Sequence, residues 1–271
     1  MKERMMGRKM VKLSCIRGQM RGGDIEGDWV TMGVVINKTN PKTSANKANE
    51  KILEERFPCV DFTFDGRTPV NPDTLPSPRL IKIHLPSYSL LPQTIKDKKC
   101  KIVYVSRNSK DNFVSFYFFA KMLKSQKVEN LSLKQWGMLF LGDKVSYGPY
   151  WKHNLSYWDV REEANILFIK YEDMKKDPNA SIRKIAEYLG KELTEDQVDL
   201  IAEATSFKKM KTNPKANYDW LPENDVPETH KFMRKGQVGD WKNHFDDELS
   251  QKFDQAYKMN FGPSGLQHDF E

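Results

Sequence analysis

Residues 101–120 read KIVYVSRNSKDNFVSFYFFA, and the change of pattern inside this stretch indicates the fold class. Residues 101–105 form a short, continuous, β-branched run, which is typical of a parallel strand buried on both faces. A polar loop follows, and residues 111–124 then have the pattern of a helix with an aromatic face. A buried strand that leads through a short loop into a helix is the beginning of a βαβ unit.

The same alternation continues on both sides of this stretch. Further strands are expected at residues 28–36, where the start of a buried helix is the alternative, and at 79–84 and 165–171. Helices are expected at residues 179–190, 195–204 and 246–258. The sequence therefore predicts a single α/β domain with a mostly parallel sheet flanked by helices. Ligands of such sheets bind beyond the carboxyl ends of the strands, where the sequence places His84, Arg107 and Tyr171.

The composition is that of a globular protein whose positive charge suits anionic ligands. Of its 271 residues 30% are charged, and the formal net charge is +7. The lysines are spread along the chain without a nucleic-acid-binding motif, so no nucleic acid is expected as a partner. Three cysteines without C-x-x-C spacing argue against a disulfide framework or a zinc site. No apolar stretch reaches the length of a membrane span, and we expect a cytoplasmic protein with no membrane partner and no metal.

Near the C-terminus, residues 234–243 read RKGQVGDWKN, which places two cations beside a flexible glycine. Such a segment can lay backbone amides and two positive side chains against a phosphate. The run resembles the RKGxxGDWKN signature of the cytosolic sulfotransferases, which bind 3′-phosphoadenosine 5′-phosphosulfate (PAPS). The resemblance extends from about Asn49 to Phe261 and implies the P-loop-kinase-like sulfotransferase fold. A P-loop kinase or NTPase itself is not indicated, because the chain has no G-x-x-x-x-G-K-[ST] run.

Residues 79–86, RLIKIHLP, resemble the family's RLIKTHLP, whose histidine is the general base. A neutral imidazole can accept a hydroxyl proton, so the resemblance implies that His84 is catalytic. Lys82 lies on the same face of the expected strand, where it could offset negative charge on the transferring sulfuryl group. A lone histidine at a strand end is more often structural, and the surrounding motif is what favours catalysis. Ile83 replaces the threonine usual in the family.

Three further segments resemble the family's donor site, namely residues 104–115, 170–174 and 204–214. In the first, Arg107 can pair with phosphate oxygens in a bidentate manner and Ser115 can donate its hydroxyl, although a helix-capping loop with solvated cations is the structural alternative. In the other two, an aromatic ring and a methionine would flank the adenine. The donor-site residues implied by the resemblance are Arg107, Ser115, Tyr171, Thr205, Ser206, Phe207, Met210, Phe232, Met233, Arg234, Lys235 and Gly236.

Residues 147–153, YGPYWKH, resemble the family's acceptor-lining YGSWxxH loop. Their aromatic side chains indicate an apolar or phenolic small-molecule acceptor. His153 is a second candidate beside that pocket, for which an orienting role is favoured over a catalytic one.

The resemblance fails at the N-terminus, where the family has a PKSGTTW-type loop that wraps the 5′-phosphosulfate in backbone amides. Residues 27–33 lack the lysine of that loop and bring Asp28, and the NPKTS run at 40–44 sits too close to the following segment. The sequence thus predicts a divergent N-terminal segment, 1–40, ahead of a sulfotransferase domain, 41–271. Two functions stay open. The first is sulfuryl transfer from PAPS to a hydroxyl or amine of a small acceptor. The second is a non-catalytic relative that binds PAPS or its desulfated product, 3′,5′-adenosine bisphosphate (PAP).

A last departure concerns assembly. Family members often carry a KxxxTVxxxE dimer motif after the tryptophan-lysine pair, whereas here Asp246 and Asp247 replace the threonine-valine pair. Carboxylates are costly to bury in a small interface. The sequence predicts a monomer, or a dimer that does not use residues 242–251.

Overall fold

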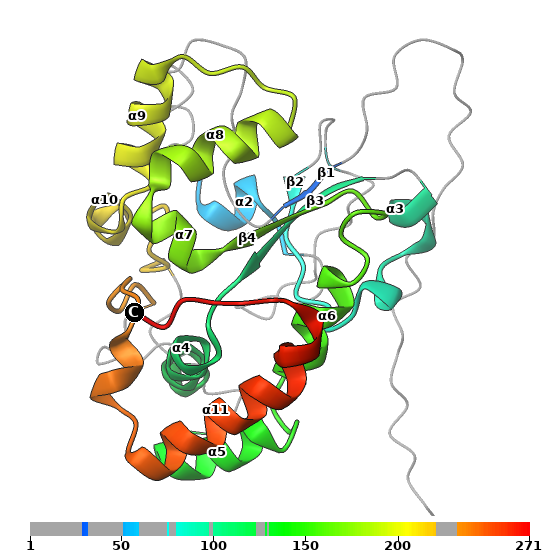
Figure 1. The fold of residues 1–271 in the computed structure, drawn as a ribbon. Helices are drawn as coiled ribbons and strands as arrows, with labels where there is room; N and C mark the ends of the chain where they lie inside the picture. Colours follow the sequence, from blue (N-terminus) through cyan, green and yellow to red (C-terminus); the bar gives the residue numbers. More distant parts are fainter. Residues whose placement is uncertain are drawn as a thin grey trace, which may run out of the picture.

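The computed structural model of the chain describes residues 29–31, 51–59, 75, 80–97, 100–122, 128, 130–220 and 232–271. They form a parallel sheet with helices on both faces (Figure 1). The strands are β1 Trp29–Thr31, β2 Leu80–Ile81, β3 Lys101–Ser106 and β4 Ile166–Lys170. The α-helices are α2 Leu53–Arg56, α3 Gln93–Asp97, α4 Ser109–Met122, α5 Leu133–Leu141, α6 Tyr150–Trp158, α7 Tyr171–Lys176, α8 Pro178–Tyr188, α9 Glu195–Ala204, α10 Phe207–Thr212 and α11 Asp247–Phe261. Short 3₁₀ turns occur at η2 Tyr88–Leu90, η4 Asp240–Asn243 and η5 Gly262–Ser264.

The four strands lie in the order β2-β1-β3-β4, and every pairing is parallel. Val30 of β1 stands opposite both Ile81 of β2 and Ile102 of β3. The strand predicted within 28–36 is therefore confirmed, and the alternative of a buried helix start is wrong. The predicted α/β fold class is confirmed as well.

Alternate residues of β3 pack on opposite sides of the sheet, as the continuous apolar run predicts. Ile102 contributes to a core cluster with Tyr157 of α6, whereas Val103 packs in a different cluster with Ile185 of α8. Burial on both faces of the strand explains why its sequence carries no alternation of polar and apolar residues.

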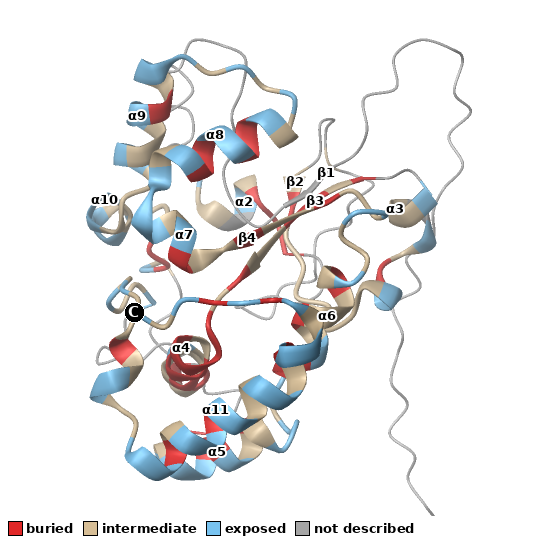
Figure 2. Cartoon of the chain, viewed as in Figure 1, coloured by how far each residue is buried: buried red, intermediate tan, exposed pale blue. Residues whose placement is uncertain are grey.

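The largest core lies beside the sheet, where α4, α5, α6 and α11 pack together (Figure 2). Phe113, Phe140, Phe253 and Phe261 form its centre and are each at most 1% exposed. Figure 2 shows α4 buried over most of its surface, while α5 and α11 present their outer faces to solvent. The helices predicted at 111–124, 179–190, 195–204 and 246–258 correspond to α4, α8, α9 and α11.

Helices α5 and α6 were not predicted from the sequence. The signal for α5 is a capping box, in which Ser132 and Gln135 satisfy each other's backbone N–H groups. Among the described helices, none is long and apolar enough to cross a membrane.

Candidate active site

The predicted site residues follow the carboxyl ends of three parallel strands. His84 lies shortly after β2, Arg107 directly follows β3, and Tyr171 is the first residue of α7, directly after β4. Because the strands are parallel, these residues meet at one edge of the sheet, as the sequence predicts.

The Arg107 guanidinium is held between β4–α7 and the loop that precedes η4. Its Cζ lies 4.4 Å from the centre of the Tyr171 ring, and Nη2 donates to the carbonyl oxygen of Gln237 at 2.9 Å. Its Nε is buried and has no hydrogen-bond partner among the described residues. A buried N–H of this kind is costly unless an acceptor is supplied, and an anionic ligand would supply one.

Gly236 brings the loop at 234–239 against α10. It has a φ of +64°, which disfavours residues with a side chain. A Cβ placed there would lie only 2.1 Å from Cδ2 of Phe207. The ring of Phe207 thus packs directly on the glycine. Residues 204–214 and the loop at 234–239, which the sequence predicts to form the donor site, are therefore in contact.

The two cations of this loop share one carboxylate. Nη2 of Arg234 lies 2.6 Å from Oδ2 of Asp240, and Nζ of Lys235 lies 2.7 Å from Oδ1. Burial acts to raise the pKa of Asp240, but the hydrogen bonds from Lys235, Asn243 and Arg234 outweigh it and hold the pKa well below its usual range. Asp240 therefore stays ionised and fixes both cations. With side chains 26% and 43% exposed, Arg234 and Lys235 still present donors to solvent.

Two buried acidic residues that the sequence analysis did not assign connect the parts of this site. Oε1 of Glu172 accepts hydrogen bonds from the backbone N of Asn108 at 2.7 Å and from its Nδ2 at 3.0 Å. Asp111 accepts from the backbone N–H groups of Gly239 and Trp241. Burial raises the pKa of Glu172, and the hydrogen bonds from Asn108 oppose that shift. The sequence carries one signal for these two residues. Asp111 ends the cationic run RNSKD, and Glu172 directly follows the tyrosine in the run KYED.

The C-terminal segment runs across the carboxyl end of β3, and its end lies beside the segment that contains η4 (Figure 1). The buried imidazole of His268 hydrogen-bonds through Nε2 to Oγ of Ser106 at 2.6 Å and through Nδ1 to Oη of Tyr257 at 3.1 Å. Burial, reinforced by the charge of Lys170 and opposed by Asp269, lowers the pKa of His268 to about 4. A neutral histidine thus anchors the tail at the end of β3.

The predicted catalytic pair has partners that the motif did not reveal. Nζ of Lys82 donates to the Tyr218 hydroxyl at 2.8 Å and lies 5.5 Å from the centre of that ring. Nδ1 of His84 lies 3.6 Å from Sγ of Cys59, and its ring centre is 5.5 Å from that of Tyr147. Both site residues are partly buried. No local signal pairs Cys59 or Tyr218 with them.

Aromatic side chains pack around His153, which belongs to the segment expected to line the acceptor. Oη of Tyr104 and Nδ1 of His153 are 2.8 Å apart, and the Tyr104 ring stacks between Tyr157 and Phe168 at 4.7 and 4.8 Å. Burial, with a smaller contribution from Tyr157, raises the pKa of Tyr104 well above its ordinary value. The neutral phenol holds the His153 ring in one orientation.

The remaining residues predicted for the donor site differ in their surroundings. The hydroxyl of Thr205 donates to the carbonyl oxygen of Ile201 at 2.7 Å, and that of Ser206 accepts from the backbone N of Lys209 at the start of α10. Ser115 is exposed on α4, whereas Met210 and Met233 are half-buried. Phe232 is 38% exposed and packs on Tyr218, with ring centres 4.2 Å apart.

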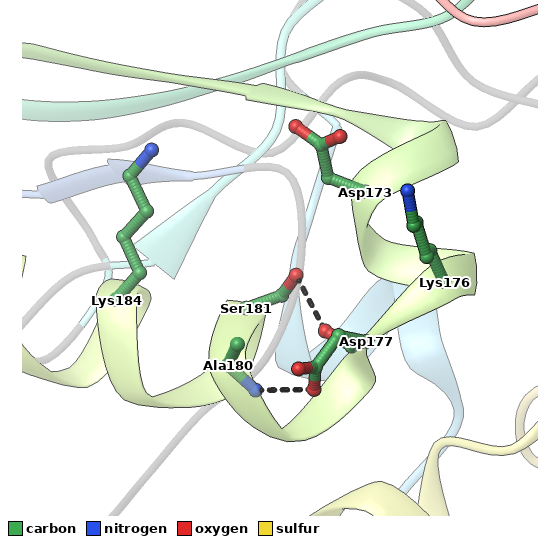
Figure 3. A pocket seen from close by; sticks show the side chains of 6 residues that line it. All are labelled: Asp173, Lys176, Asp177, Ala180, Ser181 and Lys184. Carbon is green, nitrogen blue, oxygen red and sulfur yellow. Dashed lines mark hydrogen bonds between the residues drawn. The ribbon is translucent and has the colours of Figure 1, made fainter.

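A surface hollow of about 410 Å³ lies between α7 and α8 (Figure 3). Its lining consists of Asp173, Lys176, Asp177, Ala180, Ser181 and Lys184. The Asp177 carboxylate accepts from the backbone N of Ala180 at 2.8 Å, so it serves as the N-cap of α8. No predicted site residue lines this hollow. Within the described ranges, no group of three or more His, Cys, Asp or Glu side chains is arranged to hold a metal ion.

Known proteins resemble this chain over most of its length. The family profile described as the sulfotransferase domain matches residues 29–265. Sulfotransferase 1A1 of Mus musculus is 45% identical over 216 residues, which are 78% of this chain and 73% of the relative. Sulfotransferase 1C2 of Rattus norvegicus is 36% identical, with 86% of this chain and 79% of the relative covered. A second profile, the MCM10 OB-fold, matches residues 1–54. Of these the structure describes only 29–31 and 51–54, and 29–31 are the strand β1.

Solved structures show the same fold. Retinol dehydratase in complex with androsterone and the inactive cofactor PAP superposes with a TM-score of 0.75 at 25% identity, covering 84% of this chain and 76% of that one. Mouse sulfotransferase SULT7A1 complexed with PAP has a TM-score of 0.65 at 28% identity, with 88% and 86% covered.

Proposed function

The chain belongs to the cytosolic sulfotransferase family of PAPS-dependent enzymes, and from this premise we propose which residues carry the reaction and which acceptors it takes. The reaction is transfer of the sulfuryl group of PAPS to a hydroxyl, or an amine, of a small apolar or phenolic molecule. The observation that carries the assignment of residues is the meeting of Arg107 with the loop at 234–239 at the carboxyl edge of the sheet.

The residues of the donor site fit a nucleotide with a 3′-phosphate. Arg107 offers a buried Nε without a partner in the described residues, and Arg234 and Lys235 add two adjacent cations that share the carboxylate of Asp240. Arginine suits phosphate because its guanidinium can donate two parallel hydrogen bonds. Phe207, fixed on Gly236, supplies an aromatic surface for the adenine. Ser115, Tyr171, Thr205, Ser206, Met210, Phe232 and Met233 complete the proposed set.

The catalytic assignment rests on His84 and Lys82. His84 accepts the proton of the acceptor hydroxyl, which increases the nucleophilicity of the oxygen. Lys82, held by the Tyr218 hydroxyl, stabilises negative charge that develops during transfer. PAPS supplies the activated sulfuryl group, and no metal is needed for the step.

An apolar acceptor agrees with the side chains around His84. Tyr147 packs beside the His84 ring, and the Tyr104–His153 pair belongs to a stack of aromatic rings. Two structural neighbours are named as complexes with androsterone or retinol, both small apolar alcohols. We propose acceptors of the same class, a cytoplasmic location, and a monomer or a dimer that does not use residues 242–251.

A non-catalytic PAP-binding protein is the second candidate, and one observation favours it. The sequence has no PKSGTTW-type run, and residues 32–50, which follow β1 in the sequence, lie outside the described residues. Losing one preorganised donor aimed at developing charge lowers a rate by about 10²–10³-fold, and such a loop contributes several.

The two candidates are separated by binding and turnover assays on one preparation. PAP binding is measured by calorimetry, and sulfation is measured with PAPS against a panel of phenols, hydroxysteroids and retinol. The enzyme predicts PAP binding with turnover, and His84→Ala should then lower turnover by about 10²–10⁴-fold while PAP binding is retained. PAP binding without turnover on any acceptor supports the second candidate. A chimera with a PKSGTTW-type segment ahead of Val34 should then gain activity. Absence of PAP binding would contradict both.

A further inference from the structure

The carboxylate of Asp111, in the first turn of α4, is fully buried and accepts three hydrogen bonds. Oδ2 accepts from the backbone N of Gly239 at 2.7 Å and from Nδ2 of Asn108 at 3.0 Å. Oδ1 accepts from the backbone N of Trp241 at 3.0 Å. Both oxygens are therefore used, and each binds a backbone N–H of the same distant loop.

These bonds join two segments that lie 128 and 130 residues apart in the sequence. One segment is the turn from β3 into α4, which carries Arg107. The other is the loop at 234–239, which carries Arg234 and leads into η4. The first N–H groups of a helical turn have no partner within the turn and attract an anion, which here is the Asp111 carboxylate.

Arg107 is held by the same contact. Its Nη2 donates to the carbonyl oxygen of Gln237, close to Gly239, and lies 3.8 Å from Oδ2 of Asp111. A movement of the loop away from Asp111 would therefore also displace the carbonyl that orients the guanidinium. One buried side chain therefore ties Arg107 to the loop that carries the other two cations assigned to the donor.

We propose that Asp111 is a positioning residue of the donor site, which fixes Arg107 and the loop at 234–239 in their binding arrangement before the nucleotide arrives. The inference rests on the proposed function, since it concerns the site for the 3′-phosphate. Asp111 acts without touching the donor, because a carboxylate beside a phosphate would repel it. Asp111 preorganises the loop. Because the loop is already ordered, less free energy is lost in ordering it when the nucleotide binds.

The Asp111→Asn variant tests this role because it keeps the size of the side chain but not its acceptors. An amide has one acceptor oxygen, and its NH₂ group would face the N–H of Gly239 or Trp241. Asp246→Asn is the matched control. Asp246 also accepts a backbone N–H at the start of a helix, that of Leu249 at 2.7 Å, and the substitution removes the same charge. Asparagine caps helices as well as aspartate does.

PAP affinity is measured by calorimetry for the wild type and both variants, with the fitted stoichiometry giving the folded fraction. We expect Asp111→Asn to bind PAP about 10²-fold more weakly per folded molecule, since the loss of one well-placed hydrogen bond to a charged group lowers affinity by up to about that factor. In turnover, the KM for PAPS should rise while the KM for the acceptor stays unchanged. Asp246→Asn should match the wild type in each measurement.

The outcomes are distinguishable. If the wild type binds PAP and Asp111→Asn binds it equally well, the positioning role is refuted and the proposed function stands. If the wild type does not bind PAP, the proposed function fails and this inference fails with it. Should Asp111→Asn not fold, amide hydrogen exchange on the wild type decides. Protection of the Gly239 and Trp241 amides without PAP supports preorganisation, whereas protection that appears only with PAP refutes it.

Discussion

Replacement of Gly236 by alanine tests whether the contact between the loop at 234–239 and α10 shapes the donor site. Gly236 has a φ of +64°, and an added Cβ would lie 2.1, 2.6 and 2.7 Å from three ring atoms of Phe207. Carbon atoms in contact sit about 3.5–4.0 Å apart. The Phe207 ring, or the loop itself, must therefore move by more than about 1 Å.

Two costs are expected, and they can be estimated separately. A side chain in the left-handed backbone region costs about 1–2 kcal/mol. Forcing extra volume into a packed contact typically costs about 1–3 kcal/mol more. Gly236→Ala should therefore destabilise the fold by about 2–5 kcal/mol. Because Phe207 and Gly236 both belong to the proposed donor site, the displacement should also weaken PAP binding by about 10-fold to 10²-fold, the worth of one base–aromatic stacking contact.

The assay is a double-mutant cycle with a matched control. Urea unfolding and PAP calorimetry are run on the wild type, Gly236→Ala, Phe207→Ala and the double variant. Removing the ring should reduce the cost of Gly236→Ala to its backbone part, so the coupling free energy is about 1–3 kcal/mol. Gly265→Ala measures the backbone part alone, since Gly265 has a φ of +72° and no atom lies within 4 Å of an added Cβ.

The reasoning would be refuted by a cost of Gly236→Ala that is equal with and without the Phe207 ring. It would also be refuted if Gly236→Ala and Gly265→Ala destabilised the protein equally, because the backbone conformation would then account for the whole effect.

Three further predictions concern binding, pH and assembly. Arg107→Ala should weaken PAP binding by about 10²-fold in calorimetry, because it removes a bidentate charge-assisted donor; unchanged affinity would contradict its assignment. Burial lowers the pKa of His268 to about 4, so between about pH 6.5 and pH 4 the unfolded chain binds more protons than the folded protein. On acidification from pH 7 to pH 4, the free energy of unfolding of the wild type should accordingly fall by about 3 kcal/mol more than that of His268→Gln. Equal decreases in the two proteins, measured by urea unfolding at each pH, would contradict this prediction. Asp247→Arg should leave the sedimentation behaviour unchanged, because residues 242–251 are predicted to lie outside any dimer interface; a change of oligomeric state would contradict that prediction.

The acidic residues of the site have different tasks. Asp240 pairs with Arg234 and Lys235, and Asp111 holds the loop that carries them. Each carboxylate lies close to a cation proposed for the donor. The carboxylates hold these cations in place, and they also neutralise part of the positive charge of the site.

Much of the fold and of the site was predictable from sequence, because the relevant patterns are local. The β-branched run at 101–105 and the aromatic helix after it became β3 and α4, since strand and helix periodicity is recorded in neighbouring residues. The positions of His84, Arg107 and Tyr171 beyond strand ends followed from the same pattern, because parallel strands end at one edge. The roles assigned to these residues stay predictions.

The tertiary structure alone decided which distant residues meet. Nothing local places β1 between β2 and β3, rests Phe207 on Gly236, or brings Cys59 within 3.6 Å of His84. Asp111 is the clearest case. In the sequence it is an acidic residue in the first turn of an expected helix, whereas in the structure its partners lie 128 and 130 residues away. Such contacts depend on how the whole chain packs, because burying a carboxylate is costly unless folding supplies hydrogen-bond donors to it.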